Sequence, residues 1–221
     1  MAKDSTRKYV YFNIAIGGVF VGALVVRLYV NICPETCTRF LEFTRTTVEE
    51  KQDYGKAGYI NTHIHRIQAP VFLQAGEIQE TTPTFSDESF DIVHNRRGVV
   101  SFSNVGPDTN KCQFIISLNP NPWMDRKYVA FGQIVEGMDV LDNIEAVPTF
   151  YESPTKPIEI IECGEVPLKG IKPKSAREFS GDSKRLPMSI LSIDMDGSEI
   201  LFAPSWYEFD KQVTFDEEGR G

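Results

Sequence analysis

Five short segments of the chain together supply a cation, amide side chains and aromatic rings. They contain Arg66, Gln74, the sequence Ser-Phe-Ser-Asn-Val-Gly-Pro at residues 101–107, Gln113 and Trp123. Arginine presents several N–H donors on a planar fork, amide side chains can bind peptide groups, and aromatic rings offer apolar surface. This mixture predicts a groove for a peptide with one catalytic cation.

The composition is that of an ordinary soluble globular protein. The 221 residues are 41% hydrophobic and 24% charged, which allows one domain with an extension or two small domains. The formal net charge is -8. Binding to phosphates requires a basic surface, so we expect no nucleic-acid partner.

The cysteines give an expectation about the cellular compartment. There are four, Cys33, Cys37, Cys112 and Cys163, which is too few and too scattered for a disulfide framework, and we expect no cleavable signal peptide before them. Cys33 and Cys37 have no companion ligands at zinc-site spacing, so neither a metal nor another cofactor is expected. These features favour a reducing intracellular compartment, taken here as the cytoplasm.

Residues 9–30 are almost continuously apolar and have two interpretations. Gly-Val-Phe-Val-Gly at residues 18–22 has the spacing of a membrane-helix dimer, so a single-pass anchor is one of them. The β-branched and aromatic residues, the central Gly17-Gly18 pair and the charge of Arg27 instead favour two strands joined by a tight turn. We expect the strand pair and no membrane insertion.

The remaining predicted elements are short strands and two helices. Helical spacing of apolar residues predicts one helix that begins near Pro34 and includes Val48, and a second that includes Met138 and Ile144. Strand-like runs separated by turn residues cover residues 59–66, 71–75, 98–103, 113–118, 129–135 and 158–163. Many short strands with few helices suggest a barrel.

The C-terminal part of the chain has a different composition. Residues 167–185 contain six basic and two acidic residues, a net charge of +4, and are expected to form a solvated linker. Residues 186–221 have apolar runs on both sides of Asp196-Gly197, a dipeptide suited to a hairpin turn, followed by aromatic and acidic residues. Because an isolated hairpin is only marginally stable in water, we expect this segment to dock on a protein partner.

Several motifs, in their order along residues 9–166, resemble those of the cyclophilin family of peptidyl-prolyl cis-trans isomerases. They are Pro-Glu-Thr-Cys-Thr-Arg-Phe at 34–40, His-Ile-His-Arg-Ile at 63–67, Gly-Pro-Asp-Thr-Asn at 106–110, Cys-Gln-Phe-Ile at 112–115, Trp-Met-Asp at 123–125, Phe-Gly at 131–132 and Glu-Gly-Met at 136–138. The resemblance implies a mainly β fold, a closed eight-stranded antiparallel β-barrel capped by two α-helices, at residues 8–166. Residues 167–221 would then be a C-terminal extension.

The resemblance also implies roles for individual residues. Arg66 matches the catalytic arginine of the family, His65 stands beside it, and Gln74 is expected to hold Arg66 and the substrate carbonyl. Phe72 and Trp123 are expected to form walls of the proline pocket, and Asn104 to offer backbone groups to the peptide. The full set of expected substrate-binding residues is Val71, Phe72, Ser103, Asn104, Val105, Gln113, Ile115, Trp123, Met124 and Tyr128.

Two of these residues have simpler interpretations. His65 can be a histidine that is hydrogen-bonded at the barrel rim, because isomerisation requires no proton transfer. Arg66 can be a partner in a surface salt bridge. The matching motifs around both residues favour a catalytic role for Arg66, whereas His65 is better explained by the rim.

The expected pocket departs from the family pattern at several positions. Val71-Phe72 stands where the family has Phe-Met, Ile115 where a second pocket phenylalanine is usual, Val105 where a small alanine is usual, and Tyr128 at the position of a pocket histidine. The lost aromatic area is expected to weaken proline binding by about 1–3 kcal/mol.

The resemblance therefore implies a peptidyl-prolyl cis-trans isomerase with reduced activity, which acts on X-Pro bonds in peptides or proteins. It also implies binding of a cyclosporin-type ligand in the same groove. The alternative is a weakly active or inactive cyclophilin-like structural subunit of a larger protein assembly, which docks through its C-terminal tail. The altered pocket and the apolar extension are the features that favour this alternative.

Overall fold

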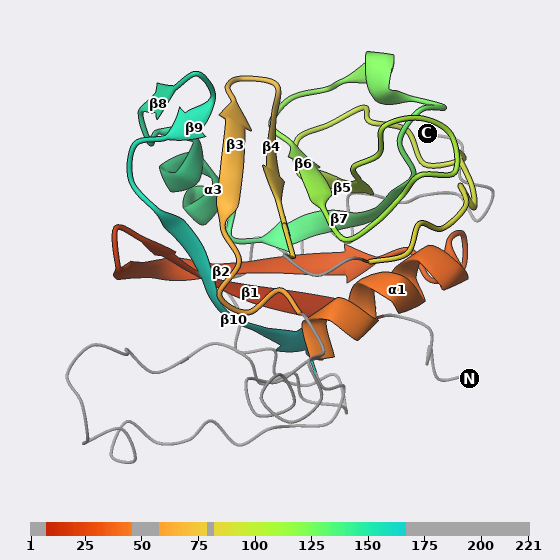
Figure 1. Ribbon diagram of the computed structural model, residues 1–221, viewed down its shortest axis with the longest axis horizontal. Coiled ribbons are helices and arrows are strands. Elements are labelled where there is room, and N and C mark those ends of the chain that lie inside the picture. Colours follow the sequence, from red (N-terminus) through yellow and green to blue (C-terminus); the bar gives the residue numbers. More distant parts are fainter. Residues whose placement is uncertain (1–7, 46–57, 79–81, 167–221) are drawn as a thin grey trace, which may run out of the picture. The chain divides into compact units, whose positions relative to one another are not determined.

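The computed structural model describes residues 8–45, 58–78 and 82–166. The strands are β1 (Lys8–Ile16), β2 (Val19–Leu28), β3 (Ile64–Gln68), β4 (Phe72–Ala75), β5 (Val99–Phe102), β6 (Phe114–Ser117), β7 (Ala130–Glu136), β8 (Thr149–Phe150), β9 (Ser153–Pro154) and β10 (Ile158–Glu165). The helices are α1 (Pro34–Arg45), the short 3-10 helix η1 (Pro122–Met124) and α3 (Met138–Glu145). Figure 1 shows these elements in order along the chain.

Eight of the strands form one antiparallel sheet that curves into a nearly closed barrel. Their order is β10-β1-β2-β7-β5-β6-β4-β3, and β8 and β9 form a separate hairpin. The two edges of the large sheet meet at an antiparallel bridge between His63 and Glu159, and the backbone N–H of Ile160 donates to the carbonyl of Thr62 at 2.9 Å. The expectation of an antiparallel barrel with two helices is confirmed.

The apolar residues 9–30 form a strand hairpin. Gly17 and Gly18 make the turn between β1 and β2 with φ angles of 59° and 79°, which glycine adopts without steric cost. The membrane-anchor interpretation of this segment is therefore wrong. In the described part of the chain, the structure has no helix with the length and apolar character needed to cross a membrane.

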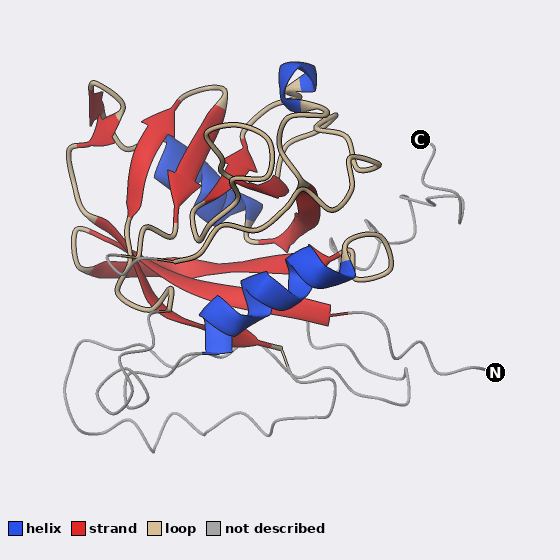
Figure 2. Cartoon of the chain, turned by 45° about the vertical axis from the view of Figure 1, so that its right-hand side comes forward, coloured by secondary structure: helices blue, strands red, loops and turns tan. Residues whose placement is uncertain are grey.

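The first helix is held by an aromatic cluster inside the barrel. Phe40 of α1 is fully buried, and its ring centroid lies 4.6 Å from that of Phe131, 5.4 Å from that of Phe114 and 5.4 Å from that of Tyr59. The helix α3 buries the aliphatic residues Val140, Leu141 and Ile144 in the same core. Figure 2 shows α1 in front of the strands and α3 behind them, and the buried apolar residues of both helices belong to the one core inside the barrel.

Three parts of the prediction need correction or lie outside the described residues. The predicted strand 59–66 begins too early, because residues 59–61 form a turn that buries Tyr59, and the strand itself starts at Ile64. The hydroxyl of Tyr59 donates to the carbonyl of Cys112 at 2.7 Å. The hairpin of β8 and β9 was not predicted. Val48 and the whole extension 167–221 lie outside the described residues.

The N-terminus of α1 is capped by a side chain from a distant loop. Pro34 occupies the first helical position, where its missing N–H costs nothing. The carboxylate of Glu88 accepts hydrogen bonds from the backbone N–H of Glu35 at 3.0 Å and of Thr36 at 2.7 Å, and from the hydroxyl of Thr36 at 2.6 Å. A negative charge at this end also complements the helix dipole.

Replacement of Glu88 is expected to destabilise the fold. Glu88→Ala leaves the first N–H groups of α1 without their acceptor, so the free energy of unfolding should fall by about 1–2 kcal/mol, as for other lost N-caps. Urea unfolding of the full chain measures the effect. Glu42→Ala, on the exposed face of the same helix, is the matched control and should change the free energy by less than about 0.5 kcal/mol. Equal losses for both variants would contradict the cap.

Candidate functional site

A β-bulge turns Arg66 toward the barrel surface. The pairing of β3 with β4 shifts its register between Ile64 and Arg66, so His65 is one extra residue in the strand. In a regular strand, Ile64 and Ile67 would point to opposite faces. The bulge puts both isoleucines in the core and leaves the side chain of Arg66 42% exposed.

His65 does not join the polar groups around Arg66. Its Nδ1 atom is buried and has no hydrogen-bond partner among the described residues. The rim hydrogen bond considered for this ring is therefore not made by Nδ1. In the structure, His65 is the extra residue of the β-bulge. A catalytic role for His65 stays a prediction.

The guanidinium of Arg66 has two partners. Its Nε–H donates to Oε2 of Glu152 at 2.6 Å, and its central carbon lies 5.1 Å from the ring centroid of Phe72. The salt bridge considered as the simpler interpretation of Arg66 is thus present. Glu152 was missed by sequence reasoning, because it is separated from Arg66 by 86 positions and no local motif marks it.

Glu152 reaches Arg66 from the turn between β8 and β9. Tyr151 and Glu152 adopt positive φ angles of 47° and 65°, which make this turn tight. The carbonyl of Glu152 accepts a hydrogen bond from the backbone N–H of Ile67 at 2.7 Å. The hairpin is therefore fastened to β3 by its backbone, one residue away from Arg66.

A second set of polar groups lies on the neighbouring strands. The side-chain amide of Gln74 donates to the hydroxyl of Ser103 at 3.1 Å and to the side-chain carbonyl of Gln113 at 2.5 Å. Gln74 was expected to hold Arg66, and the two residues are indeed register partners on β3 and β4. The structure nevertheless pairs Arg66 with Glu152, and joins Gln74 to Ser103 and Gln113.

Between these polar groups and the loop of η1 lies a small apolar cluster. Phe72, Ile115 and Met124 are buried together, and Val71 and Tyr128 pack against them. This cluster is separate from the core inside the barrel. It brings together five of the residues expected to line the proline pocket, including the four positions, Val71, Phe72, Ile115 and Tyr128, at which this cluster departs from the family pattern.

Trp123 stands at the edge of the apolar cluster. Its ring centroid lies 6.4 Å from that of Phe72 and 6.1 Å from that of Tyr128, and the residue is 47% exposed. Its indole N–H donates to the side chain of Asn121 at 3.3 Å, and Asn121 in turn donates to the carbonyl of Val71 at 2.8 Å. Trp123 is therefore fixed relative to the cluster and still open to a ligand.

The loop that carries Asn104 forms another border of the site. The side chain of Asn104 donates to the carbonyl of Lys127 at 2.7 Å, which ties this loop to the segment that follows η1. Val105 is 95% exposed and does not join the apolar cluster. The expected backbone contacts of Asn104 with a peptide stay a prediction.

The cysteines are not part of the site. Cys33 and Cys37 are buried, and their thiols donate to the carbonyls of Ala130 and Phe131 at 3.5 and 3.6 Å. Burial raises the pKa of the Cys33 thiol to about 12. In the part of the chain that the structure describes, no group of three or more His, Cys, Asp or Glu side chains could hold a metal ion.

A buried histidine supports the loop that carries Trp123. The Nδ1 atom of His94 lies 2.9 Å from Oδ1 of Asp125, and the carbonyl of His94 accepts from the backbone N–H of Asn121 at 2.7 Å. His94 is fully buried, and its Nε2 atom has no partner among the described residues. Burial lowers the pKa of His94, and the hydrogen bond with Asp125 opposes this shift in part.

A family model and several curated proteins match this chain. The model described as "Cyclophilin type peptidyl-prolyl cis-trans isomerase/CLD" matches residues 11–165. A Mus musculus protein named "Probable inactive peptidyl-prolyl cis-trans isomerase-like 6" is 38% identical over 171 residues, which cover 73% of this chain and 55% of that protein. Homo sapiens and Bos taurus proteins of the same name are 36% and 35% identical, and each match covers 74% of this chain. The chain spans just over half the length of these relatives.

The buried state of His94 predicts a pH-dependent stability. The pKa of His94 is lower in the folded protein than its ordinary value of 6.5. Its contribution to stability is therefore fully present at pH values above 6.5, and it is lost as the pH falls through the pKa of the folded state. The free energy of unfolding should therefore decrease more between pH 7.5 and pH 5.5 in the wild type than in His94→Gln, by about 1 kcal/mol.

Urea unfolding at several pH values measures this difference. His63→Gln is the matched control, because His63 is exposed and its replacement should leave the wild-type pH dependence intact. The pKa of Glu136 is raised to about 7 by burial and by Asp139, so Glu136 makes the fold more stable as the pH falls, opposite to His94. Because Glu136 is present in every variant, its effect cancels when the variants are compared at the same pH. Parallel pH profiles for the wild type and His94→Gln would contradict the prediction.

Proposed function

Because this chain belongs to the family of cyclophilin-type peptidyl-prolyl cis-trans isomerases, we propose that it binds X-Pro segments and catalyses their cis-trans isomerisation. The observation that carries the proposal is the position of Arg66 over Phe72, with 5.1 Å between the guanidinium carbon and the ring centroid. Phe72 belongs to the apolar cluster beside Trp123. A cation therefore adjoins an apolar surface that can hold a proline ring.

The reaction needs a donor in the right place and little else. Rotation about a peptide bond has a barrier of about 18–20 kcal/mol because of the double-bond character of the C–N bond. When the X-Pro bond twists, the prolyl nitrogen regains its lone pair. A guanidinium N–H of Arg66 can donate to that lone pair, and a fixed charge that acts only on the twisted state lowers the barrier.

The polar groups beside Arg66 are suited to hold the peptide backbone. Gln74, Gln113 and Ser103 form a hydrogen-bonded row, and their amide and hydroxyl groups still have donor and acceptor capacity for a peptide. We expect Gln74 to contact the substrate carbonyl, and the backbone at Asn104 to pair with the peptide.

A low rate of isomerisation is part of the proposal. Ile115 gives the apolar cluster less aromatic surface than the family pattern would, and Val71 packs at its edge in place of a phenylalanine. The named relatives are themselves called "probable inactive". We therefore propose weak catalysis, with the polar groups retained and the proline held less tightly.

Other expectations from the sequence stay predictions. The docking arm at residues 186–221 lies outside the described residues, and no observation favours a structural subunit over an isomerase. The cytoplasmic location and the absence of a nucleic-acid partner are likewise still inferred from composition alone.

Removal of the guanidinium is expected to abolish most of the catalysis. A hydrogen bond from a charged donor is worth about 1.5–3 kcal/mol, so Arg66→Ala should lower kcat/KM by about tenfold to a hundredfold. Exchange spectroscopy on a short X-Pro peptide measures the rate. Arg39→Ala, which removes an exposed arginine from α1, is the matched control and should keep the wild-type rate. Equal rates for the wild type and Arg66→Ala would refute the catalytic role of Arg66.

A cyclosporin-type ligand should bind the same groove. Trp123 offers it the largest partly exposed aromatic surface beside the apolar cluster, so Trp123→Ala should weaken its binding by about tenfold or more. Isothermal titration of the wild type and the variant measures the affinity. Val19→Ala changes an exposed side chain in the β1–β2 hairpin and serves as the control. An unchanged affinity in Trp123→Ala would place the ligand elsewhere.

A further inference from the structure

The ion pair between Arg66 and Glu152 is a feature that the isomerisation itself does not require. The reaction uses the positive charge of Arg66, whereas a carboxylate 2.6 Å from Nε offsets that charge. The side chains of Arg66 and Glu152 are 42% and 39% exposed, so a bound peptide can reach both. The pair therefore bears directly on which peptides the site can use.

The carboxylate of Glu152 is held in place by more than its attraction to Arg66. The backbone carbonyl of Glu152 accepts a hydrogen bond from the N–H of Ile67. A hydrogen bond from the N–H of Thr155 to the carbonyl of Pro148, at 2.8 Å, closes the base of the hairpin. Glu152 thus keeps a negative charge beside the groove even when Arg66 moves toward a substrate.

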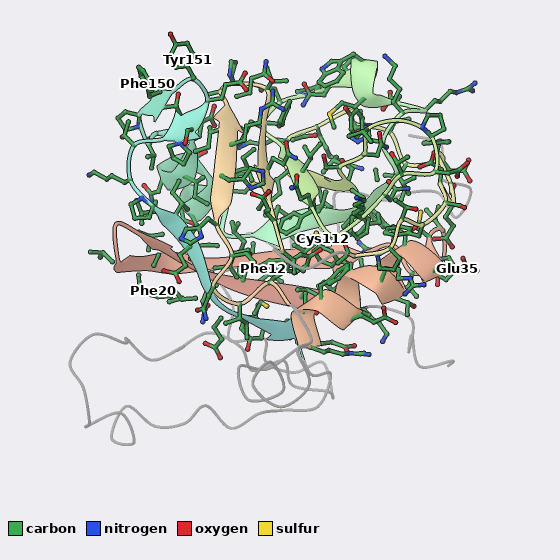
Figure 3. The ribbon with its side chains drawn as sticks, viewed as in Figure 1. Phe12, Phe20, Glu35, Cys112, Phe150 and Tyr151 are labelled. Carbon is green, nitrogen blue, oxygen red and sulfur yellow. The ribbon has the colours of Figure 1, made fainter. Side chains whose placement is uncertain are left out.

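Two exposed aromatic residues directly precede Glu152 in the β8–β9 hairpin. Phe150 and Tyr151 are 72% and 90% exposed, and their ring centroids lie 4.6 Å apart in an edge-to-face arrangement. Figure 3 shows both side chains projecting from the β8–β9 hairpin into solvent. Aromatic rings and carboxylates are both groups that a lysine or arginine side chain contacts favourably, and this hairpin presents both kinds. The net charge of -8 also favours the approach of a cationic peptide.

We propose that Glu152 determines the substrate class of this site by favouring X-Pro segments with a lysine or arginine next to the proline. This inference rests on the proposed function. A basic side chain of the peptide takes over the carboxylate of Glu152, and the charge of Arg66 then acts fully on the prolyl nitrogen. A neutral neighbour leaves the Arg66–Glu152 pair in place, and an acidic neighbour is repelled by Glu152. Adjacent peptide residues are about 4 Å apart, so such a side chain lies within reach of Arg66 and its partner.

Matched peptides that differ only in the residue after the proline, lysine or glutamate, test this inference on the full chain. The variant Glu152→Gln keeps an acceptor for the Nε–H of Arg66 and removes only the charge. The wild type should prefer the lysine peptide in kcat/KM by about fivefold, the upper end for an exposed ion pair. Glu152→Gln should turn over the glutamate peptide faster than the wild type does and lose most of the preference. Glu42→Gln makes the same charge change on α1 and should keep the wild-type preference.

Binding provides a second measurement that does not depend on catalysis. The Kd of each peptide, from the NMR shift of the Trp123 indole, should show the same preference and its loss in Glu152→Gln. If peptides bind with this preference but no protein accelerates isomerisation, the proposed function fails and the role of Glu152 stands. The inference is overturned if the wild type and Glu152→Gln discriminate the peptides equally, or if neither peptide binds the wild type.

Discussion

The aromatic cluster around Phe40 is the contact on which the rest of the fold depends. It joins α1 to strands on different sides of the barrel, because Phe12 comes from β1, Phe114 from β6 and Phe131 from β7. Rings of this size each bury a large apolar area, and their edge-to-face contacts allow few alternative arrangements. With the interior filled in this way, the curvature of the sheet is fixed, and the side chains on its outer face acquire defined positions.

The strands β4 and β6 connect the core inside the barrel with the candidate site, because each contributes side chains to both. On β6, Phe114 and Ile116 belong to the core inside the barrel, whereas Ile115 belongs to the outer apolar cluster. On β4, Leu73 faces the core and Phe72 the outer cluster. Alternation along a strand thus supplies two apolar surfaces from one short run of residues. The outer surface needs a cover, which the loop of η1 gives it through Met124.

Sequence reasoning recovered the features that have a local signal. The Gly17-Gly18 turn, the helix after Pro34 and the motifs around Arg66 and Trp123 were all visible as patterns, and the family they indicated is confirmed. The turn at Tyr59 was missed because a buried aromatic residue outside a strand looks like part of one. Glu152 was missed because its partner is distant in sequence, and only the folded chain brings the two charges together.

The bulge at His65 has a consequence for how this strand can change. Ile64 and Ile67 are an odd number of positions apart, and the extra residue lets both of them face the core. Removal of His65 would leave Ile64, Arg66 and Ile67 in regular alternation, with both isoleucines still in the core and Arg66 still on the outer face opposite Gln74. The extra residue is therefore not needed to keep the cation on the outer face, and what it adds to β3 is the local bend and stronger twist of a β-bulge.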